Sequence, residues 1–375
     1  MKIAVSSTSK VPSETANSIQ MMLACQGLVQ NGHEVRLWVP DLERVSFNVL
    51  RKHYGLTVDK FRIHSLLSLP FLNRLDFSLS MILRAFFWNP AVVYTWTIPV
   101  AAMGGFLGAT IVLEIHDVPC GKLGTSMFNY FIGSDADKRV VFISEALKQR
   151  VQEQFPKLKD AECVVAPNGV EPADYENLPD TAAAKQEMGF HDGMIVSCSG
   201  HLYAGRGVEL FMELARRFPQ VHFYWFGGNP DEAAAYRQQV ADKGQDNVFF
   251  TGFIPRSELP LAQKASDILL MPYGKAIAGS SGGDSAAICS PMKMFEYLAA
   301  GKPILTSDIP VIHEVLNSEN AIFCEPENVD SWAAALARVL EDPALRESLS
   351  NAALQESKKY SWKERAARIL SFAKR

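Results

Sequence analysis

Residues 290–308 read SPMKMFEYLAAGKPILTSD, and this stretch decides the fold class. Ser290 can cap a helix whose first residue is Pro291, and the Gly-Lys-Pro at the far end stops that helix before the apolar run PILTSD. A punctuated helix followed by a buried strand is typical of a doubly wound parallel α/β sheet. The flanking segments continue the alternation with strand patterns, DILLMPY at 267–273 and AIFCEP at 321–326.

Apolar strand-like runs and amphipathic helix-like stretches alternate along nearly all of the 375 residues. The polar segment EPADYENLPD, after Asn168-Gly169, has the composition of a connection between two sheets. We therefore predict a first domain over 1–170, a second over 171–358 and a final helix over about 359–375. Strands are expected at 2–7, 33–40, 92–96, 110–116, 139–144 and 163–167 in the first sheet, and at 194–200, 221–228, 247–253, 267–273, 303–308 and 321–326 in the second.

The composition excludes several classes of protein. Hydrophobic residues make up 48% and charged residues 21%, which is typical of chains with large cores and not of disordered ones. The 37 Lys and Arg residues against 41 Asp and Glu give a net charge of -4, which argues against a dedicated nucleic-acid binder. The six cysteines have no paired spacing, and the start MKIAVSST fits a first strand better than a signal peptide, so we expect free thiols and a cytoplasmic location.

Three stretches bear on membrane contact. Residues 85–113 carry no charge, but Asn-Pro, Pro and Gly-Gly breaks divide them into strand, helix and strand, which favours a buried βαβ unit over a membrane span. Residues 71–88, rich in Leu and Phe, suit either a helix lying at a lipid surface or an ordinary packed helix. The basic final helix is expected to keep a solvated face, with contact to anionic lipid as the alternative. Its buried face would carry Trp362, Ala366, Ile369 and Ala373.

The amino end of the helix in 290–308 is a candidate anion site. Backbone N–H groups at a helix start, together with Lys293, can cradle a diphosphate. Glu296, about two turns further on, could bind ribose hydroxyls, and an exposed Glu on a structural helix is the open alternative. The preceding Gly/Ser-rich segment 273–289 is expected to form a substrate lid, with a tolerated surface loop as the alternative.

Two more loops follow predicted strands. In GHLYAGRG, residues 200–207, the glycines would let the backbone approach a ligand, and Arg206 offers a charged donor fork for phosphate. His201 in the same loop also suits a structural polar role. In EIHDVP, residues 114–119, His116 and Asp117 sit where reactive groups usually lie, although a loop histidine and a helix cap are the plainer interpretations.

Together these segments resemble the nucleotide-sugar glycosyltransferases of GT-B fold, specifically glycosyltransferase family 4. The likeness runs nearly end to end, through NSIQMMLACQGLVQNGHEVRLWVP, LEIHD, VVFISEAL, PNGVE, GHLYAGRGVEL, FTGFIP, DILLMPY and SPMKMFEYLAAGKPILTSD, the last being the most specific. The resemblance implies two Rossmann-like domains facing across a cleft. It also implies a donor held mainly by the second domain, acceptor contacts from the first, and a terminal helix that crosses back to the first.

The resemblance also implies roles for single residues. Glu296 looks like the family's ribose-binding glutamate and His116 like its donor-sugar contact, while Arg206 stands where the family often has a Lys on the diphosphate. We expect His116, Arg206 and Lys293 to be catalytic. Donor-binding roles are expected for Glu296, Gly205, His201, Ser290, Pro291, Met292 and Asp117.

Three positions depart from the family pattern. Ile288 replaces the first glutamate of an acidic pair, His201 replaces a basic residue, and SSTSKVPSETANS replaces a Gly-Gly turn after the first strand.

The site residues, taken with the resemblance, imply a retaining, metal-independent glycosyltransferase that moves a sugar from a nucleotide-diphosphate sugar to an acceptor hydroxyl, in polysaccharide or glycolipid assembly. No cofactor is expected beyond the donor. The expected partners are that donor and a saccharide or lipid-linked acceptor, with no nucleic acid and with peripheral contact to the cytoplasmic membrane face. A binding protein that has lost turnover and a nucleotide-sugar epimerase of GT-B fold are the alternatives.

Overall fold

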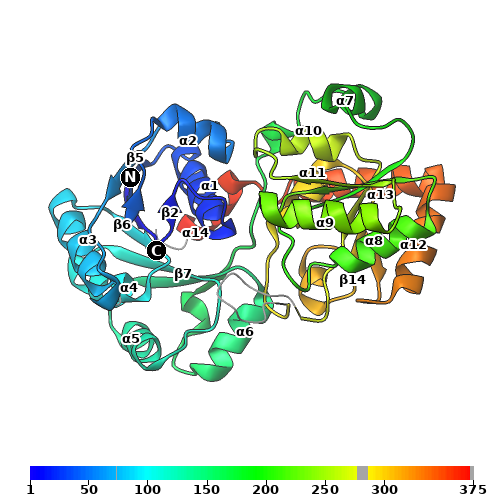
Figure 1. Ribbon diagram of the computed structural model, residues 1–375. Helices are drawn as coiled ribbons and strands as arrows, with labels where there is room; N and C mark the ends of the chain where they lie inside the picture. Colours follow the sequence, from blue (N-terminus) through cyan, green and yellow to red (C-terminus); the bar gives the residue numbers. More distant parts are fainter. Residues whose placement is uncertain (73, 277–285, 372–375) are drawn as a thin grey trace. The chain divides into compact units, whose positions relative to one another are not determined.

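The computed structural model describes residues 1–72, 74–276 and 286–371, and the chain divides into two compact units (Figure 1). The first unit combines Met1–Asn168 with Ser361–Arg375, and the second is Gly169–Tyr360. Each unit is built around its own parallel sheet.

The first unit contains a seven-stranded parallel sheet in the order β5-β3-β1-β6-β7-β8-β9. The edge strand β5 was not predicted, because its sequence RIHS is mostly polar and exposed. The strands are β1 (Lys2–Ser6), β3 (Glu34–Val39), β5 (Arg62–Ser65), β6 (Val92–Thr95), β7 (Thr110–Ile115), β8 (Lys138–Phe142) and β9 (Cys163–Val165), and β2 (Lys10–Val11) pairs separately with β4 (Asp41–Leu42). The helices are α1 (Ala16–Gln30), α2 (Phe47–Tyr54), α3 (Leu75–Trp88), α4 (Ile98–Gly104), α5 (Lys122–Gly133), α6 (Glu145–Gln154) and α14 (Trp362–Ser371), with 3-10 turns η1 (Pro70–Leu72), η2 (Gly105–Leu107) and η3 (Asp160–Glu162).

The uncharged stretch 85–113 forms the end of α3, then β6, α4 and the start of β7. Every residue of β6 and β7 is buried, as expected for strands that helices cover on both faces. Among the described residues, no helix is long and apolar enough to cross a membrane. The predicted βαβ unit is therefore present.

The C-terminal helix α14 packs on α1 of the first unit (Figure 1). Gly27 of α1 allows this approach, because a Cβ there would lie 2.2 Å from the carbonyl oxygen of Trp362. The Asn31 side chain adds a hydrogen bond of 2.8 Å to the Lys363 carbonyl. Trp362, Ala366 and Ile369 are buried as predicted, and Ala373 lies outside the described residues.

One residue of α14 corrects the prediction of a solvated basic face. Arg365 is buried, and its guanidinium points into the first unit, where it pairs with Glu114. The hydrophobic periodicity of the sequence does not reveal that Arg365 is buried, because the same pattern fits an exposed arginine until the partner of its charge is known.

The second unit contains a six-stranded parallel sheet in the order β12-β11-β10-β13-β14-β15. Its strands are β10 (Ile195–Ser199), β11 (His222–Phe226), β12 (Val248–Gly252), β13 (Ile268–Met271), β14 (Ile304–Ser307) and β15 (Ile322–Cys324). Its helices are α7 (Thr181–Met188), α8 (Val208–Arg217), α9 (Pro230–Asp242), α10 (Leu259–Lys264), α11 (Met292–Ala300), α12 (Val329–Glu341) and α13 (Pro343–Ser357), with 3-10 turns η4 (Pro172–Asp174) and η5 (Pro310–Glu314).

Helices cover both faces of this second sheet. Phe223 and Trp225 of β11 pack into a core with residues of α8 and α12, whereas Tyr224 and Phe226 pack with Ala262 of α10 on the other face. The strand order reverses between β10 and β13, which are neighbours although two strands separate them in sequence. Such a switch point is where open α/β sheets bind ligands, beyond the carboxyl ends of the strands.

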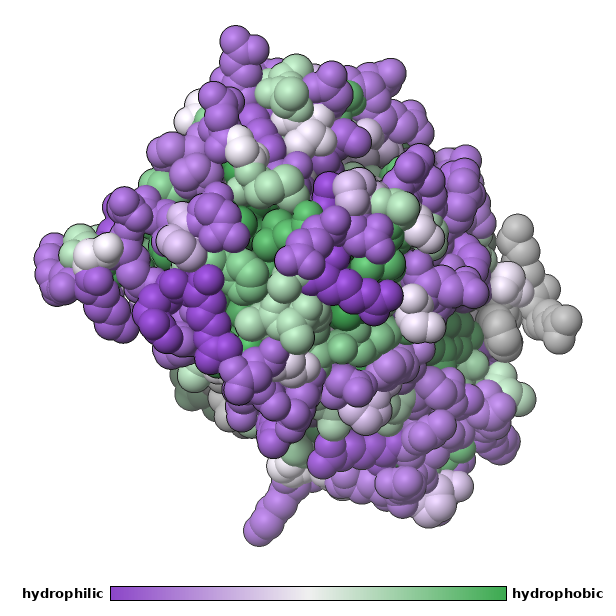
Figure 2. Space-filling view, turned by 90° about the vertical axis from the view of Figure 1, so that its right-hand side faces the viewer, coloured by the Kyte–Doolittle hydropathy of each residue, from purple (hydrophilic) through white to green (hydrophobic). Residues whose placement is uncertain are grey.

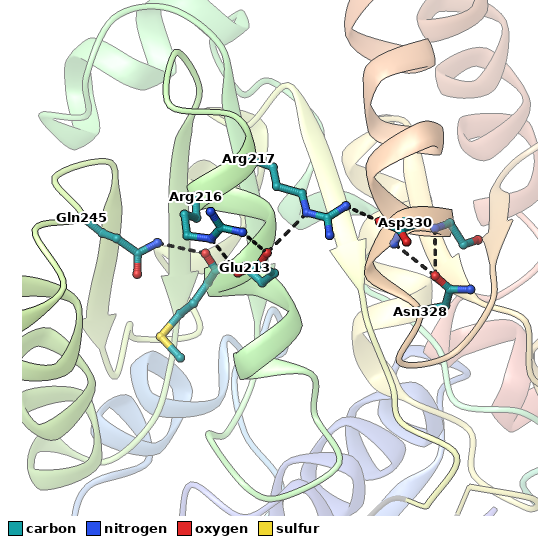
Figure 3. A network of polar contacts seen from close by, with 8 residues as sticks. Glu213, Arg216, Arg217, Gln245, Asn328 and Asp330 are labelled. Carbon is teal, nitrogen blue, oxygen red and sulfur yellow. Dashed lines mark hydrogen bonds and ion pairs between the residues drawn. The ribbon is translucent and has the colours of Figure 1, made fainter.

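Surface ion pairs join α8 to α12 in the second unit (Figure 3). Glu213 accepts from Arg216 at 2.6 Å and from Arg217 at 3.3 Å, and Arg217 also pairs with Asp330 at 2.5 Å. Exposed pairs of this kind contribute little to stability.

Figure 2 shows one face of the molecule, on which hydrophilic residues predominate around a central patch of hydrophobic ones.

Candidate functional site

Helix α11 begins one residue later than its sequence suggests. Pro291, with φ -66° and ψ 127°, is the N-cap residue, and Met292 is the first helical residue. Ser290 therefore precedes the N-cap residue. The first backbone N–H groups of this nine-residue helix lack acceptors within the helix, as in the first turn of any helix.

Lys293 is a buried cation in the first turn of α11. Its side chain lies under Trp225 and Tyr273, with Nζ 5.9 and 5.1 Å from the two ring centroids and 3.6 Å from Sγ of Cys198. No carboxylate of the described residues lies within ion-pair distance of its ammonium group. Gly200 is close as well, since a Cβ there would lie 3.2 Å from Nζ.

Arg206, in the loop after β10, reaches the same tyrosine. Nη1 donates a hydrogen bond of 3.1 Å to the Tyr273 hydroxyl, and the guanidinium carbon lies 5.2 Å from the ring centroid. Nε of Arg206 is buried and has no partner among the described residues, and no described carboxylate pairs with this side chain. The structure thus brings two predicted cations, Arg206 and Lys293, to one ring without a neutralising carboxylate.

Gly200 and Gly207 of the 200–207 loop lie close to other protein atoms, and the close approach of this loop to a ligand stays a prediction. A Cβ on Gly207 would lie 1.9 Å from the Pro272 carbonyl oxygen, so this position tolerates no side chain. Gly205, at φ 77°, accepts a hydrogen bond of 2.9 Å from the Gly274 amide. His201 stacks on Tyr203 at 4.8 Å between ring centroids. These contacts shape the loop that carries Arg206.

Glu296 is buried, so the alternative of an exposed glutamate on a structural helix is wrong. Its Oε1 accepts a 2.7 Å hydrogen bond from Nη1 of Arg256, and its Oε2 lies 3.4 Å from Nε2 of Gln263. Gln263 in turn accepts a 2.6 Å hydrogen bond from the Tyr175 hydroxyl. Sequence reasoning missed Arg256 and Gln263, although Arg256 directly follows the motif FTGFIP.

A second carboxyl group lies in this network. Burial, together with the nearby Glu171 and Glu296 and against the opposing charge of Arg256, raises the pKa of Asp174 to about 7. Arg256 also has a raised pKa, because the attraction of Glu296 outweighs the effect of burial on its charge. The carboxylate of Glu296 is thus held in a fixed position beside a permanent cation.

His116 and Asp117 lie in the first unit, in the loop after β7. Nε2 of His116 lies 2.8 Å from Oε1 of the buried Glu114. Asp117 is exposed, and its Oδ1 accepts a 2.8 Å hydrogen bond from the Val118 amide, so it does not cap a helix. The other predicted site residues belong to the second unit.

The Gly/Ser-rich segment 273–289 was expected to form a substrate lid, and no metal ion was expected in the site. Most of the predicted lid, residues 277–285, lies outside the described residues. Within the described part of the chain, no group of three or more His, Cys, Asp or Glu side chains is arranged to hold a metal ion.

Family models match both units. Residues 20–174 match the model described as Glycosyltransferase Family 4, and residues 180–356 match the model described as Glycosyl transferases group 1. An uncharacterized glycosyltransferase of Methanocaldococcus jannaschii is 24% identical over 374 residues, which cover 90% of this chain and 88% of that protein. The GDP-mannose-dependent alpha-(1-6)-phosphatidylinositol monomannoside mannosyltransferase of Mycolicibacterium smegmatis is 26% identical over 246 residues, 64% of this chain and 62% of that protein.

Solved structures share the fold over almost the whole chain. HepE of Anabaena in complex with UDP superposes with a TM-score of 0.73 at 16% identity, covering 99% of this chain and 100% of that one. WaaG, a glycosyltransferase involved in lipopolysaccharide biosynthesis, gives 0.70 at 16% identity, covering 98% and 99%. The two parallel α/β units, the matched models and these neighbours agree, and the chain belongs to the GT-B glycosyltransferases of family 4.

Proposed function

We propose that this glycosyltransferase moves a sugar from a nucleotide-diphosphate sugar to an acceptor hydroxyl with retention of configuration and without a metal ion. The observation that carries the proposal is the placement of Arg206 and Lys293 on one tyrosine ring with no described carboxylate partner. A positive charge that is partly removed from water and has no carboxylate partner is costly, and a bound anion would offset that cost. A departing diphosphate is such an anion.

The reaction would use these cations in the transition state. As the bond from sugar to diphosphate breaks, negative charge grows on the leaving oxygens, and the sugar acquires oxocarbenium character. Arg206, Lys293 and the first amides of α11 would stabilise that charge from fixed positions. Ser290, Pro291 and Met292 would contribute by placing these amides, and Gly205 and His201 by shaping the loop of Arg206.

Glu296 would bind the ribose hydroxyls of the donor. A carboxylate has about four acceptor positions, of which Arg256 and Gln263 use two, so room remains for two hydroxyl donors. His116 and Asp117 of the first unit would contact the donor sugar. The first unit would otherwise bind the acceptor.

The acceptor is proposed to be lipid-linked or a saccharide reached from the cytoplasmic membrane face. Support comes from α3 and the turn before it, where large apolar side chains are exposed, Phe71 at 77% and Phe87 at 85%. Leu79, Leu83 and Phe86 continue this surface at helical spacing, with Arg84 beside it. A helix face of this composition can lie in the headgroup region of a bilayer.

Ligand-induced stabilisation tests the donor assignment directly. The melting temperature should rise in the presence of UDP or GDP, because a ligand that binds only the folded state stabilises it by mass action. Lys293→Met should abolish the rise for every nucleoside diphosphate, whereas the surface variant Arg216→Ala should keep it. Absence of any rise in the wild-type protein would contradict the proposal.

Donor hydrolysis and product analysis test the chemistry. We expect slow release of sugar from the donor without acceptor and a product with the anomeric configuration of the donor. Binding without hydrolysis or transfer would instead favour the binding-protein alternative, which the buried Ile288 at the position of the family's first acidic residue motivates. An inverted product would refute the retaining mechanism.

A further inference from the structure

Glu114 is a fully buried carboxylate in strand β7, of which every residue is buried. Its Oε1 accepts hydrogen bonds from Nε2 of Gln20 at 2.6 Å, from Nη2 of Arg365 at 2.8 Å and from the His116 ring at 2.8 Å. Its Oε2 accepts from the Tyr94 hydroxyl. A buried charge is stable only when it is paired and hydrogen-bonded, and these four donors meet that condition.

Arg365 supplies the compensating charge from α14. Its Nε donates to the Pro167 carbonyl at 2.9 Å, Nη2 to the Ala166 carbonyl at 3.0 Å, and Nη1 to the Tyr94 hydroxyl at 3.2 Å. Together with the hydrogen bond to Glu114, the guanidinium donates four hydrogen bonds. The opposite charges of the two side chains strengthen the bond between them. A residue near the end of the chain thus completes the surroundings of a strand in the middle of the first unit.

Glu114 is ionised over the whole physiological range. Burial alone would raise its pKa, but the attraction of Arg365 and the hydrogen bond from His116 outweigh burial and lower the pKa to about 2. An ionised carboxylate can only accept hydrogen bonds. The His116 nitrogen that faces it, Nε2, must therefore carry a hydrogen.

This requirement fixes the tautomer of His116. In the neutral ring only one nitrogen is protonated, so a hydrogen on Nε2 leaves Nδ1 with a free lone pair. The ring is partly exposed, with 22% of the side chain accessible, whereas Glu114 is fully enclosed. Nδ1, the ring nitrogen that does not contact Glu114, can then act as a hydrogen-bond acceptor.

We propose that Glu114 and Arg365 are positioning residues that hold His116 as its Nε2–H tautomer, so that Nδ1 accepts a hydrogen bond from a hydroxyl group of the donor sugar. The proposal rests on the proposed function, which assigns His116 to the donor sugar. In this arrangement the sugar hydroxyl donates the hydrogen bond and Nδ1 of His116 accepts it, because Glu114 and Arg365 determine which ring nitrogen is protonated. Neither residue touches the substrate.

The tautomer can be measured without substrate. In protein labelled with 15N-histidine, the chemical shifts of the two ring nitrogens distinguish Nδ1–H from Nε2–H, and loss of one of the eight histidine signals in His116→Asn assigns the resonance. We expect His116 of the wild-type protein to show a protonated Nε2 and an unprotonated Nδ1. An unprotonated Nε2, a ring protonated on both nitrogens, or equal populations of the two tautomers would overturn the proposal.

A double variant tests the role of the pair. Glu114→Gln alone would leave Arg365 buried and unpaired, so Glu114→Gln is combined with Arg365→Met, which removes both charges at similar volume. The preference for Nε2–H should fall by about tenfold, because a neutral acceptor replaces a charged one. Affinity for the nucleotide-sugar should fall by a similar factor, while affinity for the nucleoside diphosphate should not change, since it lacks the sugar hydroxyl.

A matched variant controls for loosening of α14. Ile369→Val removes one buried methyl group from the same helix without touching the network, and we expect wild-type tautomer and affinities. An unchanged tautomer in the double variant, or an equal loss of affinity for diphosphate and nucleotide-sugar, would show that the pair is only structural. If the wild-type protein bound no nucleotide-sugar at all, the proposed function would fail, whatever the tautomer measurement showed.

Discussion

At the residue scale, the second unit holds two cations, Arg206 and Lys293, that form no ion pair within the described part of the fold. Arg206 and Lys293 both lie against the Tyr273 ring but form no ion pair with a described carboxylate, whereas Arg256 and the buried Arg365 are each paired with a glutamate. An arginine that is paired with a glutamate stabilises the fold or holds that glutamate in position. Lys293 is buried and Arg206 is partly buried, and cations without a carboxylate partner in such surroundings suit a site that binds anions.

Arg206→Ala should lower turnover by about 10²- to 10³-fold, because the guanidinium meets charge that develops only as the diphosphate leaves. Nucleotide affinity should change much less. Arg206→Lys should recover much of the activity but not a bidentate contact. Steady-state kinetics with a nucleotide-sugar donor provides the measurement.

Arg216→Ala is the matched control, since it removes one arginine from an exposed ion pair of the same unit. Its turnover should equal that of the wild-type protein. Wild-type turnover in Arg206→Ala, or a variant that does not fold, would show that Arg206 is a structural residue of the loop.

Asp174 predicts a pH dependence of stability. Its pKa is about 7 in the folded protein and close to its ordinary value of 3.8 in the unfolded chain. Between these values the folded state holds a proton that the unfolded state has lost, so the free energy of unfolding should fall as pH rises from about 4 to about 7. Asp174→Asn should remove this contribution, and the difference between the two proteins should develop within that window.

Urea denaturation at a series of pH values measures this difference. Asp59→Asn, at an exposed position, controls for the change in net charge and should follow the wild-type curve. A constant difference between wild type and Asp174→Asn across the window would contradict the raised pKa.

At the element scale, the packing of α14 on α1 depends on the missing side chain of Gly27. Alanine normally favours a helix over glycine by roughly 0.5–1 kcal/mol. At Gly27, however, the new Cβ would lie 2.2 Å from the backbone oxygen of Trp362, which cannot move without shifting α14. We expect Gly27→Ala to destabilise the protein by about 1–3 kcal/mol, the usual range for an overpacked core.

Gly124→Ala in α5 is the matched comparison. A Cβ there would meet nothing within 4 Å, so only the helix preference remains, and this variant should be slightly stabilised. If urea denaturation gave the same change in the free energy of unfolding for both substitutions, α14 would not be in close contact with α1 at Gly27.

The exposed apolar face of α3 predicts binding to anionic vesicles. Phe86→Ser with Phe87→Ser should reduce liposome flotation by at least about tenfold, because each phenylalanine that enters the interface contributes on the order of 1.5–3 kcal/mol. Turnover on a water-soluble acceptor should not change. Val49→Ser, an exposed position on α2, is the control.

Failure of the wild-type protein to bind such vesicles, combined with normal turnover on a soluble acceptor, would remove the membrane proposal. It would leave the donor assignment intact, because α3 and the Arg206 loop belong to different units.

At the scale of the whole molecule, transfer should survive EDTA. Cationic side chains and helix amides would supply the charge that Mg²⁺ or Mn²⁺ supplies in other transferases. The test compares initial rates of transfer after dialysis against chelator with rates after metal is added back. Loss of activity that Mg²⁺ or Mn²⁺ restores would count against the proposed mechanism.

The twelve predicted strands all occur in the structure, with ends that differ by a residue or two. Their sequences decide this locally, because an apolar run such as TIVLEI can only be buried between helices. The edge strand β5 escaped prediction because its residues are mostly exposed and polar, and edge pairing leaves no hydrophobic pattern. The start of α11 was one residue off because proline suits both the cap and the first turn.

Sequence alone determined the alternation of strands and helices, the two sheets and the family, because periodicity and short motifs are local properties. The tertiary structure alone decided which charges meet. Glu114 and Arg365 are separated by 251 residues, and Glu296 and Arg256 by 40. Neither pair has a signature in the chain, since a charged residue in an apolar strand or helix is stable only beside a partner that folding brings to it. For the same reason, the missing partners of Arg206 and Lys293 became visible only once the surrounding side chains were in place.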